Sequence, residues 1–276
     1  MARDIVKYQH PGNREEQQDS VGILIDSTSG VVFALVADGA GGHSGGRLAS
    51  ETVWREAEAT FHRHSHPVPD PAALLREIAN RGHDAVFSLG AERGISPKTT
   101  VAAVYLEGTT LHGLHSGDSR IYLFRAGGIL RRTIDHSVAQ MLVEQGIIHE
   151  SEMGSHPDQG KLTQCLGTAS FAEPDTFSAV LKENDTVLLC SDGFWEHFTE
   201  SEMEKIQDYI ACHEARGAAE IALACLDRGH GKADNLSLVF IGSATNEDVT
   251  RWMRNLLVPL LLLLSGMITG YLLTWL

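Results

Sequence analysis

Residues 31–43 read VVFALVADGAGGH, and this stretch decides how the rest of the chain is interpreted. Its first seven residues are apolar, which is typical of a buried β-strand. Asp38 and Gly39 follow where that strand would end. A rigid strand end fixes the position of a carboxylate, and a glycine beside it lets a ligand or a second backbone segment approach closely. A single Asp-Gly after a strand is usually only a turn, so its interpretation depends on the rest of the chain.

Two further acidic residues have the same relation to a predicted strand. Asp192 follows the run 187–191 and precedes Gly193, and Asp234 comes just before the run 236–241. Carboxylates that converge from separate strand ends form an all-oxygen site, which hard cations such as Mg²⁺ and Mn²⁺ prefer. The sequence therefore predicts a divalent-metal site built from three distant segments.

Short apolar runs and helical patterns alternate along the chain before residue 243. The apolar runs predict strands at residues 21–25, 31–37, 100–106, 111–114, 120–125, 129–132, 186–190 and 236–241. The helical patterns predict helices at residues 45–63, from Asp70-Pro71 onward, at 137–145, from Thr199 onward and at 218–228. Many strands in hairpin order with paired helices favour antiparallel sheets covered by helices, an α+β fold, over a doubly wound parallel sheet.

The composition restricts the class of protein. The chain has 276 residues and a net charge of −14. An acidic surface of this kind does not suit a general nucleic-acid binder, because the phosphate backbone of a nucleic acid is attracted to basic patches. The four cysteines include no pair with CxxC spacing, so we expect neither a disulfide framework nor a cysteine zinc site.

The C-terminal stretch differs in kind from the rest. Residues 256–276 carry no charged side chain. As a helix at 1.5 Å per residue they would span roughly 32 Å, about the hydrocarbon thickness of a bilayer. This pattern predicts a single transmembrane helix, with a buried core helix or an oligomerisation helix as the less favoured alternative. Gly266 and Gly270 form a GxxxG motif through which two copies could pair as a homodimer.

The charges beside this stretch predict its orientation. Arg251 and Arg254 precede it, and Tyr271 and Trp275 lie toward its far end as interfacial anchors would. No further sequence follows Leu276, so we expect the whole preceding region on the arginine side of the membrane. By the positive-inside rule that side is the cytoplasm.

Residues 36–43 resemble the DGxGGH signature of bacterial PP2C-type (PPM) metal-dependent Ser/Thr protein phosphatases. Six more segments resemble the motifs of this family in the same order: RxxNEDS at 14–20, GDSR at 117–120, DHS at 135–137, LTRALG at 162–167, SDGLW at 191–195 and DN at 234–235. Each motif alone is weak evidence, but seven in order are specific.

The resemblance covers residues 5–242 and implies a four-layer α-β-β-α sandwich of two antiparallel sheets flanked by helices. The expected organisation is a phosphatase domain at 1–242, a juxtamembrane linker at 243–255 and the transmembrane helix at 256–276.

The resemblance also implies roles for the metal site. Asp38 would bridge two ions, with the Gly39 carbonyl on one of them, and Asp192 and Asp234 would complete the other. Asp19 would hold metal-bound water. The ions expected are Mn²⁺ or Mg²⁺.

Two more residues gain a role in the same way. Asp118 would help to bind a third, weaker ion that is found in bacterial members, and Arg14 would grip the substrate phosphate with its guanidinium. A metal-activated water would then hydrolyse phosphoserine or phosphothreonine. No GxSxG motif or cysteine signature suggests a covalent nucleophile. The expected partners are phosphorylated proteins, the substrates of a Ser/Thr kinase that this enzyme would oppose at the membrane.

The chain departs from the family pattern at several positions. Gln17-Gln18 replaces Asn-Glu, so one water-holding carboxylate becomes an amide, and Ala40 stands where eukaryotic members carry a histidine. Residues 147–161 fall where bacterial members carry a mobile flap, and Gly160 stands where an asparagine is common. Of these departures, Gln18 alone favours a second hypothesis, a catalytically weak or inactive relative that binds phosphopeptides as a scaffold.

Several other polar residues have simpler explanations than a site. His62, His64 and His66 could bind a metal, but a solvated polar turn is favoured. His43 could orient a ligand or pack at a helix start.

A second group of polar residues also has simpler explanations. His115, Asp118 and Ser119 lie too close along one strand to converge as a triad. The segment 135–137 is expected to cap the helix that follows it.

Overall fold

The computed structural model describes residues 4–40 and 45–242, which contain two five-stranded antiparallel sheets. The first sheet has the order β1 (Ile5–His10), β12 (Leu236–Ile241), β11 (Thr186–Cys190), β8 (Arg120–Arg125) and β9 (Gly128–Arg132). The second has the order β10 (Asp175–Val180), β7 (Thr110–Ser116), β6 (Val101–Glu107), β3 (Val32–Ala37) and β2 (Ser20–Ile25). A short pair is formed by β4 (Gly39–Ala40) and β5 (Lys98–Thr99).

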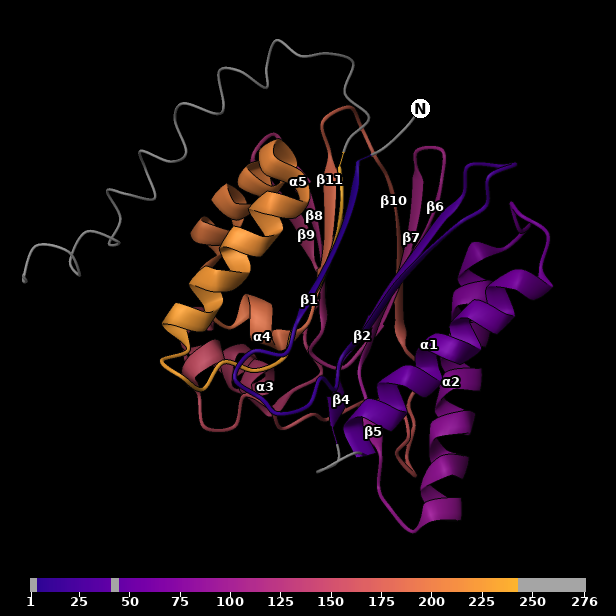
Figure 1. Cartoon of the computed structure of the whole chain (residues 1–276), viewed down its shortest axis with the longest axis horizontal. Coiled ribbons are helices and arrows are strands. Elements are labelled where there is room, and N and C mark those ends of the chain that lie inside the picture. The colour runs from indigo at the N-terminus through magenta and orange to yellow at the C-terminus, as the bar shows by residue number, and fades with distance from the viewer. Residues whose placement is uncertain (1–3, 41–44, 243–276) are drawn as a thin grey trace, which may run out of the picture.

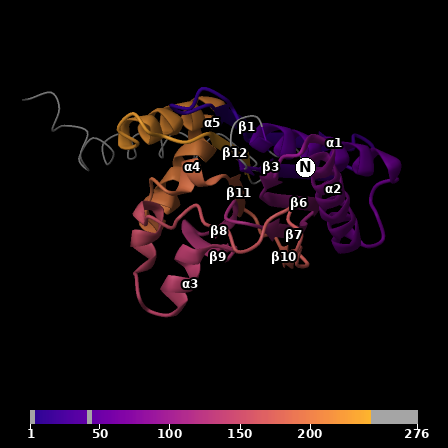
Figure 2. The same ribbon diagram turned by 90° about the horizontal axis from the view of Figure 1, so that it is seen from below.

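Helices cover the outer face of each sheet, so the layers run helix, sheet, sheet, helix (Figure 1). On the second sheet lie α1 (Gly45–Arg63) and α2 (Pro71–Arg93), and on the first lies α5 (Glu200–Arg228). Three shorter helices also pack against the first sheet: α3 (Val138–Glu144), the 3-10 helix η1 (Glu150–Ser155) and α4 (Asp192–Trp195). The view from below shows α1 and α2 on the opposite side of the strands from α5 (Figure 2).

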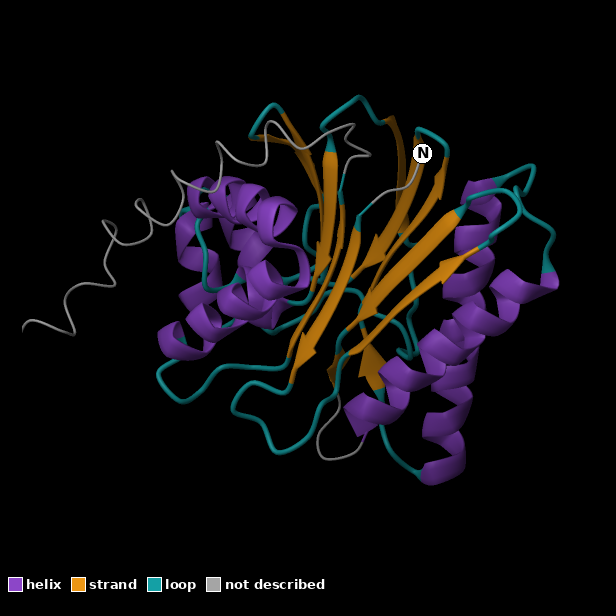
Figure 3. Ribbon diagram, turned by 45° about the horizontal axis from the view of Figure 1, so that its top comes forward, coloured by secondary structure: helices purple, strands orange, loops and turns teal. Residues whose placement is uncertain are grey.

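The alternation of side chains along β3 explains this layering. Phe33 and Leu35 pack against α1 and α2, whereas Val32, Ala34 and Val36 pack between the two sheets. Successive strand residues point to opposite faces, so a strand that is apolar throughout must be covered on both sides. The expected α-β-β-α sandwich is therefore confirmed for the described residues (Figure 3).

The predicted elements match the longer observed ones closely, and the main differences concern the edge strands and α5. Both β1 and β10 were missing from the prediction, because these edge strands are half-exposed and mix polar with apolar residues. The helix predicted at 218–228 is the second half of α5, which continues across a kink at Glu214.

No helix in the described ranges is long and apolar enough to cross a bilayer. The predicted linker and span, residues 243–276, lie outside the described residues together with Gly266 and Gly270. Gly41, Gly42 and His43 of the DGxGGH segment also lie outside the described residues.

Candidate metal centre

Strand ends from both sheets meet at one end of the sandwich, and each brings a carboxylate. In the second sheet Asp38 follows β3 and Asp19 precedes β2, and these ends are adjacent because Ser20 pairs with Ala37. In the first sheet Asp192 follows β11 and Asp234 lies just before β12, the neighbouring antiparallel strand. Asp118 precedes β8, whose first residue pairs with the last residue of β11.

The backbone of Asp38 is fixed by the start of β6. Its amide donates to the Thr100 hydroxyl at 2.9 Å, and its carbonyl accepts from the Thr100 amide at 2.8 Å and from the Thr99 hydroxyl at 2.9 Å. Thr100 in turn bonds to the Ser119 hydroxyl at 2.6 Å, next to Asp118. The loop that carries Asp118 is thus tied to the strand end that carries Asp38.

Asp19 and Asp192 each keep one carboxylate oxygen without a partner. Asp19 Oδ2 accepts from the Ser191 hydroxyl at 2.9 Å, and Asp192 Oδ2 accepts from Gln159 Nε2 at 3.0 Å. Asp19 Oδ1 and Asp192 Oδ1 are buried and have no hydrogen-bond partner among the described residues. Buried polar atoms are rarely left unpaired, so these two oxygens are suited to a ligand that offers positive charge.

Asp234 and Arg14 form an ion pair at the edge of the cluster. Arg14 comes from the segment between β1 and β2, and its Nη2 lies 2.6 Å from Asp234 Oδ2. The Arg14 side chain is 58% exposed, so it lies at the mouth of the site and not in its interior. The other oxygen of Asp234 accepts from the Asn235 amide at 2.7 Å.

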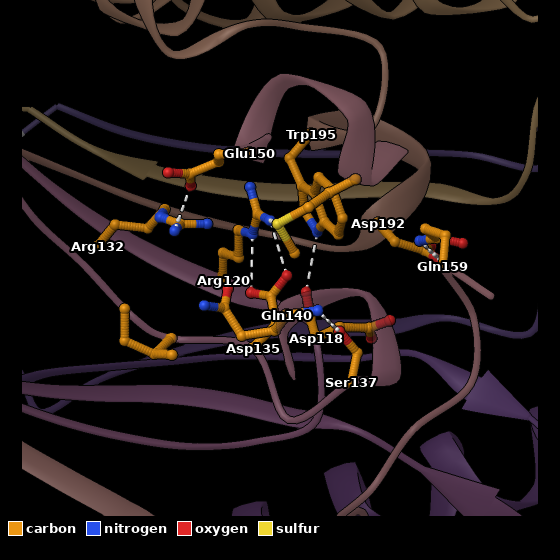
Figure 4. A network of polar contacts seen from close by, with 12 residues as sticks. Asp118, Arg120, Arg132, Asp135, Ser137, Gln140, Glu150, Gln159, Asp192 and Trp195 are labelled. Carbon is orange, nitrogen blue, oxygen red and sulfur yellow. Dashed lines mark hydrogen bonds and ion pairs between the residues drawn. The ribbon is translucent and has the colours of Figure 1, made fainter. Parts of the chain in front are cut away.

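Asp118 is the most deeply enclosed of the group, and Figure 4 shows its surroundings. Its backbone carbonyl accepts from Trp195 Nε1 at 2.9 Å. Arg120 covers a face of the Trp195 ring: its guanidinium carbon lies 3.4 Å from the ring centroid, and its nitrogens bind Asp135 in bidentate fashion. This buried Arg120–Asp135 pair therefore holds Trp195 in place beside Asp118.

The carboxylates raise one another's pKa values. Burial raises the pKa of Asp19 to about 8, and the charge of Asp192 adds to the shift. Burial and the charge of Asp192 likewise raise the pKa values of Asp38 and Asp118 well above their usual range. The pKa of Asp234 is raised by the same two causes. The cluster cannot be fully ionised by itself, and divalent cations supply the charge that would allow it.

Two glycines allow backbone segments to approach each other closely beside the cluster. A Cβ on Gly46 would lie 2.5 Å from the Gly39 carbonyl oxygen and 2.8 Å from Gln18 Oε1, and a Cβ on Gly39 would lie 2.1 Å from the Gly46 carbonyl oxygen. Only glycines fit here. With the unpaired carboxylate oxygens, this all-oxygen set suits Mg²⁺ or Mn²⁺ and not a soft metal.

Glu196 belongs to this cluster, although sequence reasoning missed it. It ends α4, and its amide donates to the Asp192 carbonyl at 2.9 Å. Burial and the charges of Asp192 and Asp234 raise the pKa of Glu196 to about 8. The available signal was its spacing, because residues four apart on a helix share one face.

The flap segment 147–161 reaches the site from the side. Its helix η1 begins at Glu150, which pairs with Arg132 of β9 (Figure 4). Its distal part supplies Gln159, the residue that donates to Asp192. The segment is thus joined to the first sheet at one end and to the carboxylate cluster at the other.

The departures from the family pattern have clear positions. The Gln18 side chain packs against Gly46, and its backbone amide donates to Asn235 Oδ1 at 2.7 Å, next to Asp234. Ala40 is exposed at the end of β4, and the space around Gly160 is open.

The simpler interpretations of the other polar residues are largely confirmed. Ser137 caps α3 by accepting from the Gln140 amide. His115 bonds to the Ile134 carbonyl and not to Ser119, so no triad forms. His115 also lies near His136 and Asp175, but the two imidazole rings stack at 14°, so their in-plane lone pairs do not converge on one ion.

The histidines near the end of α1 take separate roles. His64 lies 3.1 Å from Glu77 at the surface. His66 stacks on Phe61 with ring centroids 3.8 Å apart and bonds to the Tyr105 hydroxyl. All four cysteines are free and buried.

Comparisons with known proteins all identify protein phosphatases as similar to this chain. The family model described as Protein phosphatase 2C matches residues 8–226. A protein phosphatase 2C-type protein of Streptococcus pyogenes is 32% identical over 241 residues, which cover 86% of this chain and 95% of the relative. The serine/threonine phosphatase Stp of Listeria monocytogenes is 29% identical and covers 83% of this chain and 90% of its own length. A crystal structure of the PstP catalytic domain in complex with two manganese ions matches with a TM-score of 0.74 at 25% identity, over 88% of this chain and 99% of that chain.

Proposed function

The chain belongs to the protein phosphatase 2C family of metal-dependent Ser/Thr protein phosphatases, and from that premise we propose that its carboxylate cluster holds two Mn²⁺ or Mg²⁺ ions. The observation that carries the proposal is the pair of buried, unpartnered oxygens on Asp19 and Asp192, which come from different sheets. The substrates are phosphorylated proteins. Hydrolysis of their phosphoserine and phosphothreonine takes place at this cluster.

Each carboxylate has a distinct task in the proposal. Asp38 would hold both ions, the Gly39 carbonyl would contribute to one of them, and Asp192 and Asp234 would complete the other. Asp19 would act through water. Asp118 would help to hold a third, weaker ion. The positions of these residues at converging strand ends support the assignment.

The chemistry divides between the ions and the protein. When bound, the ions offset the charge of the phosphate and lower the pKa of water, so that hydroxide is present near neutral pH. Arg14, at the mouth of the site, binds the phosphate through its guanidinium once the phosphate competes for it with Asp234. The flap contacts the rim through Gln159. No side-chain nucleophile is required, and the four cysteines are buried away from solvent.

The test is hydrolysis of a small aryl phosphate by the purified protein with and without Mn²⁺. We expect that EDTA abolishes the activity and that Asp192→Asn removes it. Asp84 is an exposed residue of α2, so the control variant Asp84→Asn should leave the activity unchanged. Metal binding without turnover would instead support the scaffold hypothesis, a phosphopeptide binder without catalysis.

We also propose the organisation that the sequence suggests beyond the described residues. Residues 1–242 form the phosphatase domain, 243–255 a linker and 256–276 a membrane anchor, since the last stretch carries no charge. The arginines at 251 and 254 favour a cytoplasmic phosphatase domain that opposes a Ser/Thr kinase at the membrane.

Membrane fractionation of the full chain and of a variant ending at residue 242 tests the anchor. We expect the full chain in the membrane fraction and the variant in the supernatant. Crosslinking of the full chain and of a Gly266→Leu, Gly270→Leu variant tests the homodimer, because leucines would keep the two helices apart. Equal crosslinking of both would reject the GxxxG face.

A further inference from the structure

A cavity of about 630 Å³ lies between the flap and the start of α5. Its walls come from η1, from β8 and from the segment that joins α4 to α5. Trp195 lines it and donates to the Asp118 carbonyl, and Glu196 also lines it. The Glu196 amide donates to the Asp192 carbonyl, and Glu200 on the border of the cavity is exposed. The cavity is therefore open to solvent and adjoins the carboxylate cluster where a substrate phosphate would bind.

The charged groups at this cavity are mainly negative. Four glutamates line it: Glu150, Glu196, Glu200 and Glu202. Arg132 contacts two of these glutamates and Arg228 a third. Arg120 also lines the cavity, but it is already neutralised by Asp135 behind it. Five carboxylates thus face three arginines, which leaves an excess of negative charge around the cavity.

Glu196 carries part of this excess. No arginine forms an ion pair with it in the part of the chain that the structure describes, and its side chain is only 18% exposed. His197 Nε2 lies 3.4 Å from Glu196 Oε1. Burial and the charge of Arg228 lower the pKa of His197, so this imidazole supplies no positive charge near pH 7. A cationic group in the cavity would give Glu196 the partner that a half-buried carboxylate favours.

The shape of the cavity and its walls indicate which kind of cation fits. A metal ion needs ligand atoms that converge on one point, and the described residues form no such group of carboxylates at this cavity. An arginine or lysine side chain can instead reach separate carboxylates through its long stem. Phe198 and Met203 give the wall an apolar part that suits the methylene groups of that stem.

We propose that this cavity is a specificity pocket that receives an arginine or lysine side chain of the phosphorylated substrate, close to the residue that is dephosphorylated. Glu196 and Glu200 bind its cationic group. The inference rests on the proposed function, because the pocket selects substrates for the metal centre. It names their class: phosphoproteins that carry a basic residue close to the phosphoserine or phosphothreonine.

The test compares phosphothreonine peptides as substrates of the full chain with Mn²⁺. In the parent peptide the neighbours of the phosphothreonine are uncharged, and in the series a single arginine is moved one position at a time along either side. We expect kcat/KM for the best arginine peptide to exceed that for the parent about fivefold, as for one partly exposed ion pair. Added NaCl should reduce this preference, because salt screens exposed charges.

Two substitutions at Glu200 test whether the preference arises in the cavity. Glu200→Gln removes one charge, and we expect the preference to fall to about twofold or less. Glu200→Lys places a cation there, so the arginine peptide should become a poorer substrate than the parent. The preference is a ratio of two kcat/KM values for one variant, so a loss of folded protein or of general activity cancels in it.

Glu58→Gln is the matched control, since Glu58 is an exposed glutamate of α1 and does not line the cavity. It should keep the wild-type preference.

Three results would overturn the inference. Equal kcat/KM for the parent and every arginine peptide would remove the pocket and leave the phosphatase intact. A preference that Glu200→Lys does not change would show that it arises elsewhere on the protein. A wild-type protein that hydrolyses neither the peptides nor an aryl phosphate with Mn²⁺ would reject the proposed function and this inference together.

Discussion

Asp38 and Asp118 lie in the same cluster but are expected to differ in importance. If Asp38 bridges two ions, Asp38→Asn weakens both, and we expect a loss in kcat/KM on the order of 10²–10³-fold. Asp118→Asn affects only a third ion and should cost less. Steady-state kinetics with an aryl phosphate at saturating Mn²⁺ give the ranking, and comparable losses would contradict the bridging role.

The raised pKa of Asp19 predicts how pH affects the metal-free protein. In the folded state Asp19 keeps its proton up to about pH 8, whereas the unfolded chain loses it near the ordinary value of 3.8. The folded state binds more protons between these values, so the free energy of unfolding falls as the pH rises through this window. For one such group the fall is about 1.4 kcal/mol per pH unit.

Thermal unfolding in EDTA between pH 4 and pH 8 measures this dependence. Asp19→Asn removes the titrating group, so its melting temperature should vary less with pH than that of the wild type. Parallel curves for the two proteins would exclude Asp19 as a source of the effect.

At the residue scale the sequence predicted some site residues and missed others for physical reasons. Asp38, Asp192 and Asp234 adjoin strands that are almost entirely apolar, so the strand ends can be read directly from the sequence. Arg14 lies in an irregular segment after a half-exposed strand, so only the family resemblance indicated it. Glu196 was missed because its role depends on how α4 directs it back toward Asp192.

Among the elements, the flap depends on a close contact with α4. A Cβ on Gly154 of η1 would lie 2.4 Å from the Glu196 carbonyl oxygen, whereas one on Gly160 would meet nothing within 4 Å. Gly154→Ala should therefore displace the flap and disturb the bond from Gln159 to Asp192. We expect kcat/KM to fall about tenfold, as for the loss of a supporting contact in a metal site.

Gly160→Ala is the control for this change and should retain wild-type kinetics. Limited proteolysis of residues 147–161 provides an independent measure, with faster cleavage expected in Gly154→Ala alone. Equal cleavage and equal kinetics in the two variants would show that the contact at Gly154 does not position the flap.

The strands and helices were predictable to different degrees. Central strands such as β3 and β12 are apolar on both faces because a layer covers each side, so their sequence identifies them. The edge strand β10 has an exposed face, and its mixed composition resembles that of a loop. The kink at Glu214 depends on packing within α5, and no residue pattern before it predicts a φ of 53° there.

For the whole molecule, metal binding and folding stability should be coupled. The proposed ligands come from both sheets, and no such arrangement persists in the unfolded chain. At a Mn²⁺ concentration of about 100 times the dissociation constant, one site stabilises the folded state by about 2.7 kcal/mol. We expect this to raise the melting temperature by roughly 5–10 °C for a domain of this size.

Calorimetry with Mn²⁺ and with EDTA checks this coupling. Asp192→Asn should abolish most of the increase, while Asp84→Asn should preserve it. A melting temperature that does not respond to Mn²⁺ in the wild type would mean that the ions do not join the two sheets.

The layer of aliphatic side chains between the sheets also separates the two sides of the proposed metal centre. Asp38 is carried by one wall of this layer and Asp192 by the other, and residues such as Val36 and Leu189 fill the gap between the walls. A change in the thickness of this layer would alter the distance between these two carboxylates, even though neither aspartate has been substituted. Substitutions in the layer between the sheets would therefore lower the catalytic rate before they unfold the protein.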